Sequence, residues 1–235
     1  QAAVDHDAIR RDRINKLLPE AMKTHGFDMW LTFTRENTTD PILPTLGVEH
    51  IVARGAFVFM LKPDGSFRKV AIAASYDIEP IEKSGLYDKV ISYKKEGIKP
   101  HLRALVAEAD PKTIAINYSR DVTVSDGLTM GLRRYLDEAL GGEPDFTSRF
   151  VSAEKLVVSL LGRKLPQEIA ALRQAAEDTQ KIINEALTTG VIKPGVTTEI
   201  ALNDWMVARA KQMGDEVAFA SIVVGPSRGH SAPPS

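Results

Sequence analysis

Strand-like and helix-like segments alternate along the first 140 residues, and this order restricts the folds open to the chain. Two apolar, β-prone runs, 56–61 and 67–74, flank Lys62-Pro63-Asp64-Gly65, whose residues are typical of a tight turn. Helical and strand patterns then follow one another. Because alternating elements of this kind pack as helices on a sheet, the sequence predicts a layered α/β domain with a mixed sheet and at least one antiparallel hairpin.

Local signals predict the individual elements of this domain. An apolar stripe at helical spacing predicts a first helix that starts after Asp5 and Asp7 and ends at Gly26. Residues 34–55 receive no assignment, because Pro41 and Pro44 interrupt regular structure. The further predictions are strands at 29–33, 89–93 and 113–117 and helices at 77–84, 100–109 and 128–140.

The last third of the chain has mainly helical patterns. A helix at 153–161 is expected, followed by a long one that begins near Pro166 and ends at Gly190. The apolar face of the long helix is predicted to consist of Ile169, Leu172, Ala176, Ile183 and Leu187.

Thr197 is predicted to cap a further helix that runs to about Met213. A strand at 218–224 is expected after it. The change from alternating elements to long helices predicts two domains, 1–155 and 156–235.

Composition excludes several classes of function. The net charge is −1 with dispersed Lys and Arg, and aromatic residues make up 6% of the chain, which argues against a nucleic-acid partner. No apolar run approaches the roughly 18 residues of a membrane span, so no membrane partner is expected. The absence of Cys excludes disulfides and thiolate sites. The start at Gln1 favours a periplasmic or secreted protein over a cytoplasmic one.

Compact catalytic motifs are absent from the sequence, which has no Gly-x-Ser-x-Gly, no His-Glu-x-x-His and no phosphate-binding Gly-rich loop. His6, His25 and His101 are expected to be exposed, and His50 falls in the unassigned segment. His230 differs, because it follows an apolar strand pattern and a Gly-rich turn, which can present a polar side chain at the rim of a cleft. From the residues alone, two interpretations of His230 stay open: a residue of a functional site, or a histidine in a surface loop.

Three segments carry a resemblance to a known family. They are KLPQEIAALRQAA at 164–176, IKPGVTTEI at 192–200, and FASIVVG at 219–225, the last followed by His230 and Pro233. Their order and spacing resemble the opening of the pita-bread catalytic domain of Xaa-Pro aminopeptidases, prolidases, creatinases and methionine aminopeptidases. The layout upstream is similar to the N-terminal creatinase-like domain of that family, although the region 35–50 is longer and richer in Pro.

The resemblance implies a fold, an activity and a site. The fold would be a creatinase-like α/β domain at 1–155 and the beginning of an incomplete pita-bread α+β catalytic domain at 156–235. The activity would be that of a metal-dependent exopeptidase that cleaves peptides next to proline. Its partners would be a peptide substrate with proline and a second copy in a homodimer. Of the family's site residues only His230 has a counterpart here, where it would line the substrate pocket and help position substrate.

The family's metal site has no counterpart in this sequence. Two divalent ions (manganese, cobalt or zinc) would be held by two Asp, one His and two Glu that lie downstream of the position of His230. The chain alone is therefore expected to bind no metal pair and to be inactive. Three alternatives stay open: a creatinase-like C–N hydrolase, a non-enzymatic peptide-binding module, and a dimerisation module.

Overall fold

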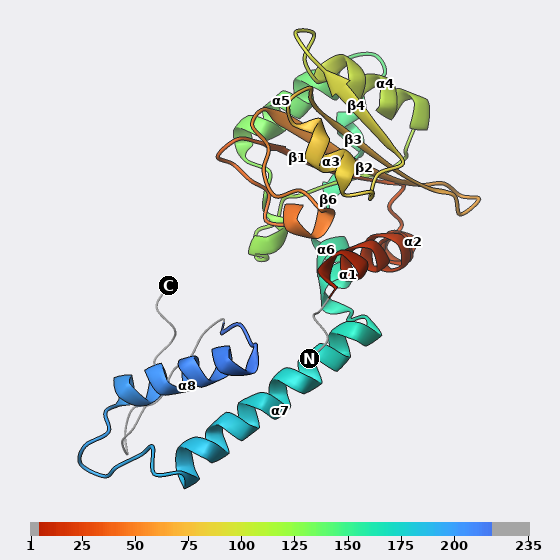
Figure 1. Ribbon diagram of the computed structural model, residues 1–235. Helices are drawn as coiled ribbons and strands as arrows, with labels where there is room; N and C mark the ends of the chain where they lie inside the picture. Colours follow the sequence, from red (N-terminus) through yellow and green to blue (C-terminus); the bar gives the residue numbers. More distant parts are fainter. Residues whose placement is uncertain (1–4, 218–235) are drawn as a thin grey trace. The chain divides into compact units, whose positions relative to one another are not determined.

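The first compact unit of the protein, residues 5–165, is built on one six-stranded sheet (Figure 1). The computed structural model describes residues 5–217 of the chain. The strand order is β4-β3-β2-β1-β5-β6, with β2 antiparallel to β1 and β3 and all other neighbours parallel. This confirms the α/β class with a mixed sheet. The strands are β1 (Met29–Arg35), β2 (Arg54–Leu61), β3 (Phe67–Ala74), β4 (Lys89–Tyr93), β5 (Ile114–Ile116) and β6 (Phe150–Ser152).

Helices cover both faces of the sheet, because the central strands carry apolar side chains on both. In β1, Trp30 belongs to one core with α1, α2 and α6, whereas Leu31 and Phe33 belong to the other core with α4 and α5. The helices of this unit are α1 (His6–Asp12), the π-helical turn η1 (Arg13–Leu17), α2 (Leu18–His25), α3 (Ile78–Lys83), α4 (Lys99–Ala109), α5 (Met130–Leu140), α6 (Glu154–Gly162) and the 3₁₀ turns η2 (Leu43–Leu46), η3 (Thr123–Ser125) and η4 (Thr147–Arg149).

The segment between β1 and β2, for which the sequence predicts no element, is an ordered part of the first core. It turns through η2 and buries a set of aliphatic side chains against the sheet. These are Ile42, Leu43, Leu46, Val48 and Ile51. Its proline residues do interrupt helix and strand, as expected, but the chain between them is buried.

Within residues 5–217, no helix combines the length and apolar character that a bilayer span requires.

The second unit, from Pro166 onward, contains α7 (Pro166–Thr188) and α8 (Glu199–Met213), which contact each other. Arg209 joins them by donating two hydrogen bonds to the Glu185 carboxylate at 2.6 and 3.0 Å. The predicted apolar face of α7 is wrong, because all five of its residues are exposed, Leu172 and Leu187 by 56% and 68%. The buried apolar residues of this helix are Ile182 and Ala186. The physical reason is that the contact with α8 covers only a narrow stripe of a long helix.

The cap of α8 is one residue later than predicted. Thr198 is the cap, because its hydroxyl accepts a hydrogen bond from the Ala201 N–H at 3.1 Å. Thr197 closes the preceding turn instead, since its hydroxyl accepts from the Lys193 N–H and donates to the Val191 carbonyl. The strand expected at 218–224 lies outside the described residues. The domain boundary at 155/156 stays a prediction; it falls within α6, which packs in the first unit.

Leu160→Ala tests whether α6 belongs to the core of the first unit. Leu160 is fully buried against the sheet, and its truncation is expected to lower the free energy of unfolding by about 2–5 kcal/mol. Val158→Ala on the exposed side of the same helix is the control, with an expected change below about 0.5 kcal/mol. Urea unfolding followed by the fluorescence of Trp30, in a Trp205→Phe background, measures both. Equal effects of the two substitutions would contradict this packing.

Candidate functional site

The structure describes four of the five histidines. His230 lies outside the described residues, so its role stays a prediction. His6 and His50 are exposed. His25 and His101 are half-buried, and each has a polar partner: Ser159 at 2.7 Å for His25 and Glu96 at 3.1 Å for His101. The expectation that His25 and His101 are simply exposed is therefore corrected, because neighbouring elements partly cover both rings.

No described residues fit the metal pair that the family resemblance implies. Within residues 5–217, no group of three or more His, Asp or Glu side chains is arranged to hold a metal ion. Two polar features of the first unit lie at opposite edges of its sheet.

A buried carboxylate, Asp40, lies at the edge where β1 ends. Its Oδ2 accepts a hydrogen bond from Asn117 Nδ2 at 2.7 Å, and its Oδ1 accepts from the Ile42 N–H at 3.1 Å. Asn117 follows β5 and also accepts from Trp30 Nε1 at 2.7 Å, while its Nδ2 lies 3.2 Å from Thr32 Oγ1. The network thus ties the segment after β1 to the end of the neighbouring parallel strand.

The environment of Asp40 changes its acidity. Burial raises the pKa of the Asp40 carboxyl to about 6, although the hydrogen bonds from Asn117 and Ile42 act in the opposite direction. Asp40 and Asn117 are almost completely shielded from solvent. A carboxyl with such a pKa is suited to acid–base chemistry, but a substrate could not reach it here. Its role in this arrangement is to hold the 36–51 segment on the sheet.

Gly127 completes the enclosure of Asp40. A Cβ atom at residue 127 would overlap the Asp40 carboxyl group, so no other residue fits without movement. No local signal in the sequence marks this site, since Asp40 and Asn117 are 77 positions apart. Only the pairing of β1 with β5 brings them together.

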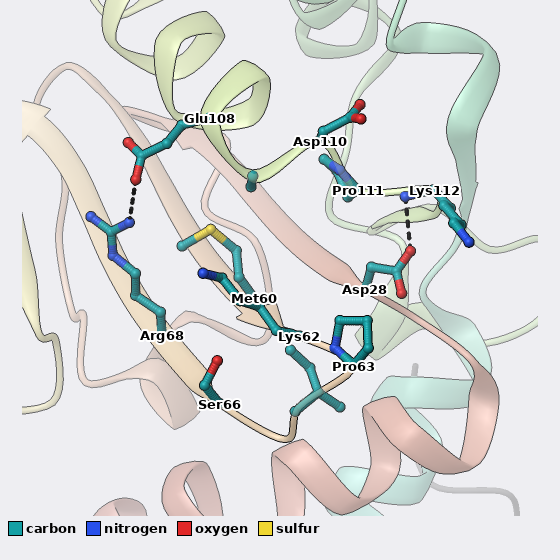
Figure 2. Close-up of a pocket in the computed structure, with 12 residues that line it drawn as sticks. Asp28, Met60, Lys62, Pro63, Ser66, Arg68, Glu108, Asp110, Pro111 and Lys112 are labelled. Atoms are coloured by element: carbon teal, nitrogen blue, oxygen red, sulfur yellow. Dashed lines mark hydrogen bonds and ion pairs between the residues drawn. The ribbon is translucent and has the colours of Figure 1, made fainter.

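A pocket of about 180 Å³ lies at the opposite edge of the sheet, between the β2–β3 turn and the end of α4 (Figure 2). Arg68 and Glu108 form an ion pair across it at 2.8 Å. The hydrogen bond and charge of Arg68 lower the pKa of Glu108. The Asp28 carboxylate also has a hydrogen-bond partner, because its Oδ2 accepts a hydrogen bond from the Lys112 N–H at 2.8 Å.

The lining of this pocket suits binding more than catalysis. Met60, Pro63 and Pro111 supply apolar surface, and Lys62 and Lys112 add positive charge at its rim. The described lining contains no His, and its carboxylates Asp28 and Glu108 are already paired. A nucleophile with an adjacent base is therefore not assembled among these residues.

The raised pKa of Asp40 predicts how stability depends on pH. The folded state binds the proton of the Asp40 carboxyl group more tightly than the unfolded state does. The contribution of this proton to the free energy of unfolding is therefore complete below the unfolded pKa of 3.8 and is lost as the pH rises through about 6. The free energy of unfolding is expected to fall by about 1 kcal/mol between pH 5 and pH 7.5 from this group. Urea unfolding of the protein and of Asp40→Asn at both pH values isolates the effect. The same pH dependence in Asp40→Asn would contradict the assignment.

The contact between Gly127 and Asp40 predicts a coupled pair of substitutions. Gly127→Ala is expected to lower the free energy of unfolding by about 1–3 kcal/mol, because the added methyl group must displace the carboxylate. In an Asp40→Ala background the same change is expected to cost less, since the obstructing group is gone. Gly131→Ala in α5 is the control, as a Cβ there meets nothing closer than Thr129 Oγ1 at 4.0 Å. Strict additivity of the two substitutions in urea unfolding would contradict the overlap.

Comparisons with known proteins find a relationship at the level of fold. No family model and no curated protein matches the sequence. A solved Xaa-Pro dipeptidase from Bacillus anthracis matches 88% of this chain and 50% of its own, with 19% identity and a TM-score of 0.52. An X-Pro aminopeptidase from Thermotoga maritima MSB8 matches 82% of this chain and 49% of its own, with 16% identity and a TM-score of 0.50.

The chain spans about half the length of these solved structures. At this level of identity the likeness concerns the backbone arrangement, and it confirms the fold that the three sequence segments and the upstream layout predicted. The chain therefore has the fold of the Xaa-Pro peptidases over about half of their length.

Proposed function

We propose that this chain is part of a metal-dependent exopeptidase that cleaves peptides next to proline. The observation that carries the proposal is the likeness of fold to two Xaa-Pro peptidases. The segments 164–176 and 192–200, which resemble the opening of the catalytic domain, correspond to the start of α7 and to the turn before α8. Sequence motif and backbone arrangement thus support the same family.

The second unit is, in this proposal, the beginning of the catalytic domain. Several apolar side chains of α7 and α8 are exposed, among them Leu172, Leu187 and Ile200 at 56%, 68% and 74%. Several exposed aliphatic side chains on two neighbouring helices are typical of a surface that further structure covers. The partial coverage of the two solved peptidases agrees with this interpretation.

The catalytic chemistry is proposed to depend on metal ligands outside residues 5–217, because the described residues do not fit a metal pair. Two bound divalent ions would supply an activated water and polarise the scissile carbonyl. His230 is proposed to line the substrate pocket and to donate a hydrogen bond to the oxygen on which charge develops. A homodimer is proposed as the assembly.

Peptidase assays on the full-length protein and on residues 1–235 test this function. The full-length protein is expected to hydrolyse Xaa-Pro dipeptides or tripeptides, to lose activity in EDTA and to regain it with manganese, cobalt or zinc. Residues 1–235 alone are expected to be inactive, since they carry no counterpart of the metal ligands. In the full-length protein, His230→Ala is expected to lower kcat/KM by about 10²–10³-fold, with the exposed His50→Ala as the control.

The outcomes of these assays separate the alternatives. Hydrolysis of creatine in place of Xaa-Pro peptides would favour the creatinase-like C–N hydrolase. Peptide binding without turnover at any metal concentration would favour a binding module. Light scattering on residues 1–165, expressed by themselves, tests whether the first unit is sufficient for dimerisation.

A further inference from the structure

Most strands of the sheet end at the same edge. Since β2 runs antiparallel to both β1 and β3, the strands β1, β3, β4, β5 and β6 all point their carboxyl ends in one direction. In open α/β sheets this is the edge beyond which ligands bind most often. Asp40 and Asn117 lie here, and the pocket of Figure 2 lies at the other edge.

Two arginines face each other at this edge. Arg35 is the last residue of β1, Arg54 is the first residue of β2, and the two are direct partners in the antiparallel register. Directly opposed residues of an antiparallel pair project from the same face of the sheet, and like charges in such a pair destabilise it. The pair therefore starts two arginine side chains from the same face at the end of the sheet. Arg35 Nε donates a hydrogen bond to Thr38 Oγ1 at 3.3 Å.

Arg54 is held by its backbone and by an aromatic ring. The Tyr93 hydroxyl accepts a hydrogen bond from the Arg54 N–H at 3.1 Å and donates one to the Arg54 carbonyl at 2.8 Å. The guanidinium carbon lies 4.3 Å from the centre of the Tyr135 ring. Arg54 Nε is buried and has no hydrogen-bond partner among the described residues. The ring contact thus orients a cation that no described carboxylate neutralises.

Two carboxylates in this region, Glu138 and Asp77, already have partners. Glu138 pairs with Lys99 at 2.6 Å, and Asp77 accepts hydrogen bonds from the N–H groups of Val52 and Ala53 at 3.1 and 3.0 Å. Lys99 Nζ also lies 4.5 Å from the centre of the Tyr135 ring, so a second cation contacts the ring that orients Arg54. Lys99 begins α4, where the helix dipole adds positive potential.

We propose that Arg35 and Arg54 form a binding site for the carboxylate or phosphate group of a small ligand. A guanidinium group donates two parallel hydrogen bonds to such an oxyanion, and an anion bound between the two arginines would offset the positive charge that they bring to the same face. The exposed Arg35 would reach the ligand from the solvent side, and Arg54 would be held in place by Tyr135 and Tyr93. The site requires no metal and is independent of the proposed peptidase activity.

Arginine side-chain NMR on the ¹⁵N-labelled chain tests this site. Inorganic phosphate and acetate are titrated separately at constant ionic strength, with sodium chloride as the compensating salt. The Nε–Hε signals of Arg54 and Arg35 are expected to shift saturably with at least one probe. A response to phosphate alone identifies a phosphate ligand, and a response to acetate alone identifies a carboxylate ligand. A response to both supports a general oxyanion site.

Substitutions separate this site from general charge attraction. Arg54→Gln and Arg35→Gln are each expected to raise the Kd of the responding probe at least about tenfold, which is the effect of losing one charge-assisted interaction. Arg68→Gln at the other edge is the matched control and is expected to leave the Kd unchanged. Because Arg35 is exposed, its variant keeps the test valid even if Arg54→Gln unfolds. Shifts that do not saturate, or an equal loss in Arg68→Gln, would overturn the proposal.

Discussion

The position of β1 between the antiparallel β2 and the parallel β5 is the constraint on which the rest of this structure depends. Because successive side chains of β1 point to opposite faces, Trp30 and Leu31 enter different cores, and each face needs its own layer of helices. The same pairing places the end of β5 beside the end of β1. The polar residues Asp40 and Asn117 meet at that edge only for this reason.

Local chemistry made much of this fold predictable from the sequence. The Pro63-Asp64-Gly65 turn and the flanking apolar runs predicted the β2–β3 hairpin, and Gly26 predicted the end of α2, where it adopts a positive φ. The sequence did not predict β6, because its half-buried Phe-Val-Ser forms no continuous apolar run, unlike the buried Ile-Ala-Ile of β5. It misjudged the buried face of α7 because hydrophobic spacing identifies an apolar stripe but not the partner that covers it.

The candidate sites differ in how far they can be predicted from the sequence. The family resemblance rested on contiguous segments, and these could be recognised without knowledge of the fold. Asp40 and Arg54 could not be singled out in this way, since a buried carboxylate or an opposed cation is defined by strand partners far along the chain. Their local surroundings are those of an ordinary loop and an ordinary strand start. Only the register of the sheet shows which polar groups have partners.

The first unit brings together segments that are far apart in the sequence and are therefore synthesised at very different times. Asn117, the hydrogen-bond partner of Trp30, is synthesised 87 residues later, and the Leu160 carbonyl that accepts from Arg13 follows it by 147 residues. A nascent chain therefore keeps one edge of β1 unpaired until β5 has been made, and the core that contains Trp30 stays incomplete until α6 has been made. Such long loop closures slow folding. During synthesis, the apolar surface of the first unit is therefore accessible to chaperones and to misassociation with other chains.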